Sequence, residues 1–437
     1  MKRRKFAKTS SILVTGSMIA PLASCSKDEA RTNWAGNLQY STNQLHRPKS
    51  VKQVKEIVKS HEKLKALGTC HSFNTIADST ENQISLQRLD KEPQLDRENM
   101  TVTVEASMRY GELGKYLQSN GYAVHNLASL PHISVAGACA TATHGSGDKN
   151  GNLASAVTGL EMITAEGEEL SLSREEDAGA FSAGVVGLGA LGVITKVTLE
   201  IEPTFDLRQD VYQYLPLKQL QDNFNAITSK GYSVSFFTDW QNETISQVWV
   251  KSRLGEGAVF EAEPELHQAK LATRHLHPIE TNSAENCTEQ MGMPGAWHHR
   301  LPHFKMDFTP SNGEELQAEY YVPRHHAVEA INAIYRLGNQ IFPHLFISEI
   351  RTIAADDLWM SPCYRQDSVT IHFTWKPDWP AVQKLLPVIE KELAPFDVRP
   401  HWGKLFSIAP ATLQSRYSRM DDFKAMAKEY DPKGKFR

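Results

Sequence analysis

The spacing of apolar residues predicts both helices and strands in the first two hundred residues. Apolar positions recur at helical intervals over 51–58, behind Ser50, a residue type that caps helix N-termini. A second helix is expected over 110–120, where Gly121 follows. Alternating apolar and polar residues predict five strands, the third and fourth forming a hairpin, at 63–67, 101–105, 160–164, 169–173 and 193–201.

Strands cluster in the second half of the chain instead of alternating with helices. Helices are expected over 324–337 and from Pro380 onward, because proline favours the first helical turn. The strands predicted here are 232–240, 247–251, 319–322, 346–353 and 369–375. This order indicates the α+β class and not a doubly wound parallel sheet. Pro203 is expected to close the first of two domains.

The composition is that of a globular protein, with 437 residues of which 41% are hydrophobic. The first twenty-four residues hold five of the chain's 47 bases and none of its 51 acids. The remainder is therefore acidic, and it has no basic run that would serve a nucleic-acid binder. No nucleic-acid partner is expected.

The N-terminus has the features of an export signal. A basic start is followed by an apolar stretch too short to span a bilayer, so residues 1–24 are interpreted as a signal peptide. Leu22-Ala23-Ser24-Cys25 resembles the lipobox of bacterial lipoproteins, and Arg3-Arg4-Lys5-Phe6 resembles the twin-arginine signal. A Sec signal with chance arginines is the alternative. We expect a cell-envelope lipoprotein anchored through Cys25, with residues 25–36 as a tether.

Two motifs are excluded by their context. The four cysteines after Cys25 form no CxxC pair and have no histidines at zinc spacing, so no metal site is predicted. Residues 187–192 satisfy GxGxxG, but a dinucleotide-binding fingerprint must open a helix, and here an alternating strand pattern follows.

A small-residue loop over 67–74 is the better candidate for cofactor binding. Such a loop can direct several backbone N–H groups at a pyrophosphate, and Thr69 and Ser72 add hydroxyl donors. It also holds His71. Taken alone, a histidine in a loop is more often an exposed residue or a satisfied polar group.

Two later segments, 127–137 and 140–147, together with the His71 loop and 189–195, resemble the FAD-binding half of the vanillyl-alcohol oxidase superfamily. The resemblance implies a two-domain flavoprotein fold, with a PCMH-type FAD-binding domain over 37–204 and an α+β substrate-binding cap domain over 205–437 whose C-terminal part returns to the flavin. It also implies covalent FAD, attached through its 8α carbon to His71. The implied FAD contacts are Ala66, Leu67, Gly68, Thr69, Cys70, His71, Ser72, Ser129, Ser134, Gly137, Thr141, Ala142, Thr143, His144, Val193 and His401.

Two details qualify the cofactor expectation. Cys70 stands where the wider superfamily often has glycine. No cysteine precedes the second loop, where 126–130 reads Asn-Leu-Ala-Ser-Leu, so we expect a single covalent bond to the flavin.

Within the superfamily, the chain resembles the alditol (xylitol) oxidases. The segments that carry this are 33–37, 286–290, 301–304, 349–352, 372–375 and 400–404. Residues two apart on a strand face the same side, so Glu349 with Arg351 and His372 with Thr374 can face one cavity. The resemblance assigns the substrate pocket to Ser129, Glu349, Arg351, His372, Thr374 and Lys404, and catalysis to Glu349, Arg351, His372 and Lys404.

The implied reaction is oxidation of the primary hydroxyl of a polyol to the aldehyde by hydride transfer to flavin N5, with oxygen reduced to hydrogen peroxide. Arg351 and Lys404 are expected to stabilise developing negative charge, while Glu349 and His372 are both candidates for receiving the hydroxyl proton. The alternatives are a sugar-1,4-lactone oxidase or dehydrogenase on the same scaffold, and a surface lipoprotein that binds polyols without turnover.

Overall fold

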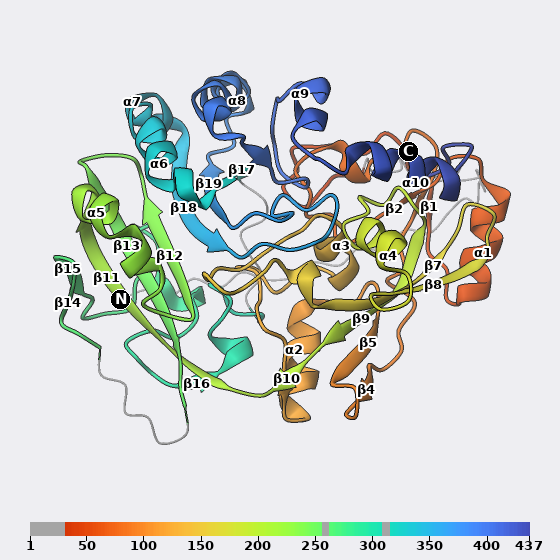
Figure 1. The fold of residues 1–437 in the computed structure, drawn as a ribbon, viewed down its shortest axis with the longest axis horizontal. Coiled ribbons are helices and arrows are strands. Elements are labelled where there is room, and N and C mark those ends of the chain that lie inside the picture. The colour runs from red at the N-terminus through yellow and green to blue at the C-terminus, as the bar shows by residue number, and fades with distance from the viewer. Residues whose placement is uncertain (1–30, 256–261, 308–314) are drawn as a thin grey trace, which may run out of the picture.

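The protein folds into two α+β domains in a computed structural model that describes residues 31–255, 262–307 and 315–437 (Figure 1). The expected signal peptide and the expected lipidated Cys25 lie outside the described residues. No helix in these ranges is long and apolar enough to cross a membrane.

The first domain contains a five-stranded antiparallel sheet, ordered β4-β5-β9-β7-β8, and a three-stranded parallel sheet, ordered β1-β3-β2. Figure 1 shows this domain on the right-hand side. Its elements are β1 (Leu45–His46), α1 (Val51–Ser60), β2 (Lys65–Ala66), β3 (Gln83–Ile84), β4 (Gln94–Asp96), β5 (Thr101–Glu105), α2 (Tyr110–Ser119), β6 (Tyr122–Ala123), α3 (Val135–Ala140), β7 (Val157–Ile163), β8 (Glu169–Ser173), α4 (Ala178–Val185), β9 (Val193–Glu200) and β10 (Glu202–Pro203).

The second domain is built on a ten-stranded antiparallel sheet, in which nine strands follow the order β14-β15-β11-β13-β12-β18-β19-β17-β20 and β16 pairs with β11. Its strands are β11 (Asp206–Pro216), β12 (Ser233–Thr238), β13 (Thr244–Arg253), β14 (Glu265–Leu266), β15 (Ala269–Leu271), β16 (Gly295–Ala296), β17 (Leu316–Pro323), β18 (Leu345–Ile353), β19 (Ser368–Trp375) and β20 (Arg399–Pro400). The helices after residue 205 are α5 (Leu217–Thr228), α6 (Ala327–Tyr335), α7 (Gly338–Ile341), α8 (Trp379–Leu393), α9 (Pro410–Ser415) and α10 (Met420–Tyr430).

The two faces of this sheet differ because side chains alternate along each strand. Tyr320, Ile350 and Ile371 project from one face into an apolar core that also contains residues of α5, α6 and α8. The opposite face carries charged and polar side chains, among them Glu349 and His372, which line a cavity between the domains. The apolar positions thus fix the sheet and leave its other face free for a polar site.

Most of the predicted elements are confirmed. The helix at 51–58 is α1, and the Ser50 side chain accepts a hydrogen bond from the Gln53 N–H at 3.3 Å. The strand β9 begins at Val193, directly after the GxGxxG sequence, which confirms that these glycines do not open a helix. The strand expected over 63–67 is reduced to two residues, and the helix expected from 324 begins with a 3-10 turn before α6.

Both ends of the described chain pack on the first domain. Leu413, Tyr417 and Phe423, from the α9–α10 region, share an apolar core with Phe181 of α4. The segment 31–36, expected to belong to a tether, is held against the His71 loop. The Trp34 N–H donates to the Cys70 carbonyl at 2.8 Å.

Candidate active site between the two domains

A cavity of about 770 Å³ lies between the domains and is lined by both of them. The first domain contributes the loop 66–73 and residues at the start of α3, and the second contributes β17, β18, β19 and the segment 401–404. All six residues predicted for the substrate pocket line it: Ser129, Glu349, Arg351, His372, Thr374 and Lys404.

Two of the predicted FAD contacts do not reach the cavity. Val193 is 1% exposed and packs in an apolar core with Val54, because it occupies an inward position at the start of β9. Ala142 is fully buried, and its carbonyl accepts a hydrogen bond from the Tyr321 hydroxyl at 3.3 Å. The structure places all the other predicted site residues on the cavity wall.

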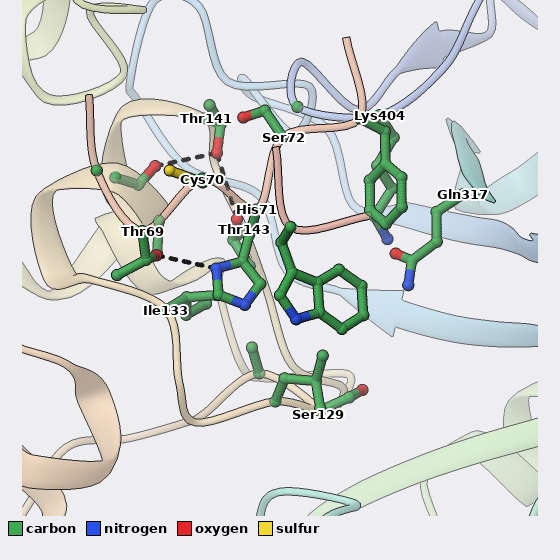
Figure 2. Close-up of a pocket in the computed structure, with 18 of the residues that line it drawn as sticks. Thr69, Cys70, His71, Ser72, Ser129, Ile133, Thr141, Thr143, Gln317 and Lys404 are labelled. Carbon is green, nitrogen blue, oxygen red and sulfur yellow. Dashed lines mark hydrogen bonds between the residues drawn. The ribbon is translucent and has the colours of Figure 1, made fainter. Parts of the chain in front are cut away.

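The His71 loop presents a neutral imidazole to the cavity. Burial, with the nearby His132 as a smaller cause, lowers the pKa of His71 to about 4. Its Nδ1 lies 3.0 Å from the Thr69 hydroxyl oxygen, while Nε2 is buried with no hydrogen-bond partner among the described residues. Figure 2 shows the side chains of Ser129, Gln317 and Lys404 directed toward the same space.

The backbone at position 70 has a conformation that favours glycine. Cys70 has a φ of 64°, in the left-handed region. A residue with a Cβ is strained there by about 1–2 kcal/mol, whereas glycine is not.

The segment 31–38 holds the loop from the other side. The Asn33 side chain donates to the Ser72 carbonyl and the Asn37 side chain to the Phe73 carbonyl, both at 2.9 Å. The Trp34 ring stacks on the His71 ring, with centroids 5.3 Å apart and planes inclined by 21°. These contacts fix the orientation of His71.

The wall around His71 fits FAD. Hydroxyl groups suited to phosphate and ribose oxygens come from Thr69, Ser72, Ser134, Thr141 and Thr143. Gly137 keeps this wall open, because a Cβ there would lie 2.8 Å from the Ser134 Oγ. The unpartnered Nε2 of His71 is the kind of buried polar atom that a bound group would satisfy.

The polar wall of the second domain is a row across three neighbouring strands. Glu349 of β18 lies opposite His372 of β19, which lies opposite Glu319 of β17. Directly opposed residues project to the same face of an antiparallel sheet. Arg351 and Lys404 add two cations beside this row.

Glu319 lies between the two cations of the site, Lys404 and Arg351, and pairs with both. Its Oε2 lies 2.7 Å from Lys404 Nζ, and its Oε1 lies 3.0 Å from an Arg351 nitrogen and 3.1 Å from His144 Nε2. Burial opposes ionisation, but Lys404, His144 and Arg351 hold the pKa of Glu319 well below its usual value. Glu319 is therefore an anion that fixes both cations.

Glu349 and His372 both face the cavity. Burial acts against the charge of Glu349, yet Arg351 and His303 hold its pKa far below the usual value. Burial, reinforced by Lys404, lowers the pKa of His372 to about 3, so its ring is neutral at pH 7. His372 Nε2 is buried and has no hydrogen-bond partner in the described ranges.

Four residues that line the cavity were not predicted as site residues from the sequence: Trp34, His303, Gln317 and Glu319. Glu319 stands at the start of a predicted strand, but only the pairing with β19 shows that it faces the cavity. Trp34 and His303 lie in segments that resemble the alditol oxidases, which was the available signal. The described residues contain no group of three or more metal-ligating side chains placed to hold a metal ion.

Two family models match the chain, one described as FAD binding domain over residues 43–173 and one as D-arabinono-1,4-lactone oxidase over residues 303–437. Among solved structures, a cholesterol oxidase from B. sterolicum has a TM-score of 0.76 at 14% identity and covers 97% of this chain and 98% of its own, which shows the two-domain flavoprotein fold.

Curated relatives cover almost the whole chain. An L-gulono-1,4-lactone dehydrogenase of Mycobacterium tuberculosis is 28% identical, and an L-gulonolactone oxidase of Mus musculus is 26% identical, each over 92% of this chain and 95% of its own. The alditol oxidase of a Streptomyces species is 44% identical over 93% of this chain and 97% of its own length. The chain therefore belongs to the alditol oxidase family of FAD-dependent oxidoreductases.

Proposed function

We propose that this protein oxidises the primary hydroxyl group of an alditol to an aldehyde, with FAD as cofactor and oxygen reduced to hydrogen peroxide. The observation that carries the proposal is the row Glu349, His372 and Glu319, flanked by Arg351 and Lys404, facing the same cavity as His71. A substrate with a hydroxyl on every carbon can pair with each of these groups, and each one left unpaired costs about 1–3 kcal/mol. FAD, when bound, accepts the hydride from the carbinol carbon.

The protein's own residues bind the polyol and handle charge. Arg351 and Lys404 are positioned to oppose negative charge that develops on the reacting oxygen. Glu349 as an anion and His372 as a neutral ring accept hydrogen bonds from substrate hydroxyls, and either can receive the hydroxyl proton.

A substrate screen under anaerobic conditions tests this function. Xylitol and sorbitol are expected to bleach the flavin absorbance, and L-gulono-1,4-lactone and D-arabinono-1,4-lactone are not. Bleaching by lactones alone would make the protein a lactone oxidase or dehydrogenase, as the names of several relatives suggest. Binding of alditols without bleaching would support a non-catalytic binding protein. Admitting air after reduction should release hydrogen peroxide.

The FAD is expected to be bound covalently to His71. The support is a neutral imidazole with an available lone pair, held at the cavity wall by Thr69 and Trp34. A tryptic peptide containing His71 should carry the mass of FAD and fluoresce after acid denaturation. The His71→Ala variant is the control, and its flavin should be released by acid. Release of all flavin from the wild-type protein by acid precipitation would refute the covalent bond.

We also propose that the protein is exported and anchored by lipid at Cys25, on the basis of the Leu22-Ala23-Ser24-Cys25 sequence. The Cys25→Ala variant should leave the membrane fraction and keep its flavin, because Cys25 precedes the residues that form the FAD site. Membrane fractionation with flavin absorbance measures both properties. A variant that sediments with membranes as the wild type does would show that the lipobox interpretation is wrong.

A further inference from the structure

Beside Glu349 lies a second pair of buried polar residues that the proposed reaction does not use, one of them, His303, on the cavity wall and the other, Lys251, outside the cavity lining. Lys251 of β13 is 1% exposed, and His303 lies in the loop that follows the short β16. Neither was predicted from the sequence. Lysine is almost never fully buried unless its charge is paired or solvated by acceptors, so this position calls for an explanation.

The contacts of Lys251 define the proton positions of His303. An ammonium group has three N–H donors and no acceptor. Lys251 Nζ meets three acceptors: the Leu301 carbonyl at 2.5 Å, the Pro302 carbonyl at 3.2 Å and His303 Nδ1 at 3.1 Å. His303 Nδ1 therefore carries the lone pair, and the ring proton of the neutral imidazole lies on Nε2.

That proton points at Glu349. His303 Nε2 lies 2.7 Å from Glu349 Oε1, a distance typical of a charge-assisted hydrogen bond. Phe237 and Trp249 meet the His303 ring edge-on, with centroids 5.5 Å and 5.2 Å away, and hold its plane. His303 and Arg351 both contact Oε1, so the other carboxylate oxygen keeps its acceptor capacity for a ligand.

We propose that Lys251 and His303 are positioning residues. Lys251 holds His303 in its Nε2–H form, and His303 thereby keeps Glu349 an oriented anion that accepts hydrogen bonds from the hydroxyl groups of the substrate. This inference rests on the proposed function, because it assigns Glu349 a substrate hydroxyl to accept. Lys251 does not line the cavity and contacts the site through its hydrogen bond to His303.

The charges around this pair are consistent with such a role. Burial lowers the pKa of Lys251 to about 7, with Glu349 acting in the opposite direction. Burial and Lys251 lower the pKa of His303 to about 4, so the imidazole is neutral when Lys251 is charged. The charged and titratable groups that face Lys251 are Cys287, Arg300, His303, Glu349 and Arg351.

The tautomer can be observed directly in the wild-type protein. With ¹⁵N-labelled histidine, the ring resonances of His303 are identified by their loss in the His303→Gln variant. A neutral ring protonated on Nε2 is expected, and its Nδ1 resonance should shift as Lys251 titrates near pH 7. A ring protonated on Nδ1, or a doubly protonated ring, overturns the proposal. This measurement requires no substrate.

Two substitutions test the consequence for Glu349. His303→Leu removes the donor to Glu349, whereas His303→Gln can keep an N–H near the position of Nε2. In His303→Leu we expect alditol affinity to fall about tenfold to a hundredfold, and the loss of flavin reduction on acidification to begin at a higher pH, because the pKa of Glu349 rises without its donor. His303→Gln should stay within a few fold of the wild type.

The shift in pH separates positioning from a merely structural role, since a loosened fold lowers the amount of active protein without moving the acid limb. An acid limb at the wild-type pH in His303→Leu, together with unchanged affinity, overturns the proposal. If the wild-type protein neither binds nor oxidises any alditol, the proposed function fails instead, and the tautomer measurement still decides the state of the Lys251–His303 pair.

Discussion

Replacing Lys404 or Arg351 by methionine should slow alditol-dependent flavin reduction by about a hundredfold to a thousandfold while the flavin stays bound. Each cation is buried beside the substrate wall, and Glu319 directs both of them. Their positive charge stabilises the negative charge that develops during the reaction. Neither group is among the hydroxyl donors suited to the FAD phosphates, so the flavin should be retained.

Anaerobic stopped-flow absorbance follows the reduction rate in each variant. Lys384→Met is a matched control, because Lys384 is exposed on α8, on the far side of the apolar core. It should reduce its flavin at the wild-type rate. Reduction near the wild-type rate in both Lys404→Met and Arg351→Met would show that these residues are structural and that the substrate is bound elsewhere.

The sequence predicted which residues share a face, but not which strands lie side by side. The two-residue spacing of Glu349 and Arg351 is local, so the shared face followed from strand geometry alone. The position of Glu319 opposite His372 depends on the register between β17 and β19, which are separated by the whole of α6, α7 and β18. Such pairing is set by long-range packing and leaves no local pattern.

The strand β11 was missed for a different reason. Its sequence mixes Arg208, Gln209 and Asp210 into an apolar run, which weakens the alternating pattern. In the folded protein Gln209 and Asp210 are buried, and Arg208 pairs with Asp210 at 2.7 Å. The Gln209 side chain also donates to the Thr288 and Glu289 carbonyls, both at 3.4 Å, so contacts that the sequence does not display accompany these polar residues into the sheet.

The loops from which FAD contacts were inferred by resemblance line the cavity, but not every predicted residue in them does. Thr141 and Thr143 reach the cavity, whereas the side chain of Ala142 between them points into the protein. Ala142 has a φ of 53°, so the backbone turns there and alternate residues separate. A match along the chain identifies a loop, and only the backbone conformation decides which of its side chains face a ligand.

Glu319→Gln is expected to destabilise the folded protein by about 3–5 kcal/mol, the cost of removing one partner from a buried ion cluster. The Glu319 side chain is fully buried, and its loss leaves Arg351 and Lys404 without the anion that they share. A fall of roughly 5 to 15 °C in the midpoint of thermal unfolding should result. Circular dichroism measures it, and Glu175→Gln, at an exposed position, serves as the matched control.

The double variant Glu319→Gln with Lys404→Met separates the effect of an unpaired cation on stability from the effect of Lys404 on the reduction rate. It removes one of the cations left without a partner, so its midpoint should lie above that of Glu319→Gln alone, although its reduction rate should stay as low as that of Lys404→Met.

The pH dependence of stability tests the same role of Glu319 independently. Because its pKa is depressed in the folded protein, Glu319 contributes stability above its ordinary value of 4.5, and that contribution is lost as the pH falls below it. Glu319→Gln should therefore lose less stability on acidification than the wild type does. An unchanged midpoint in Glu319→Gln, with the same acid sensitivity as the wild type, would mean that Arg351 and Lys404 are neutralised by Glu349 or by solvent in the cavity and that Glu319 does not organise the site.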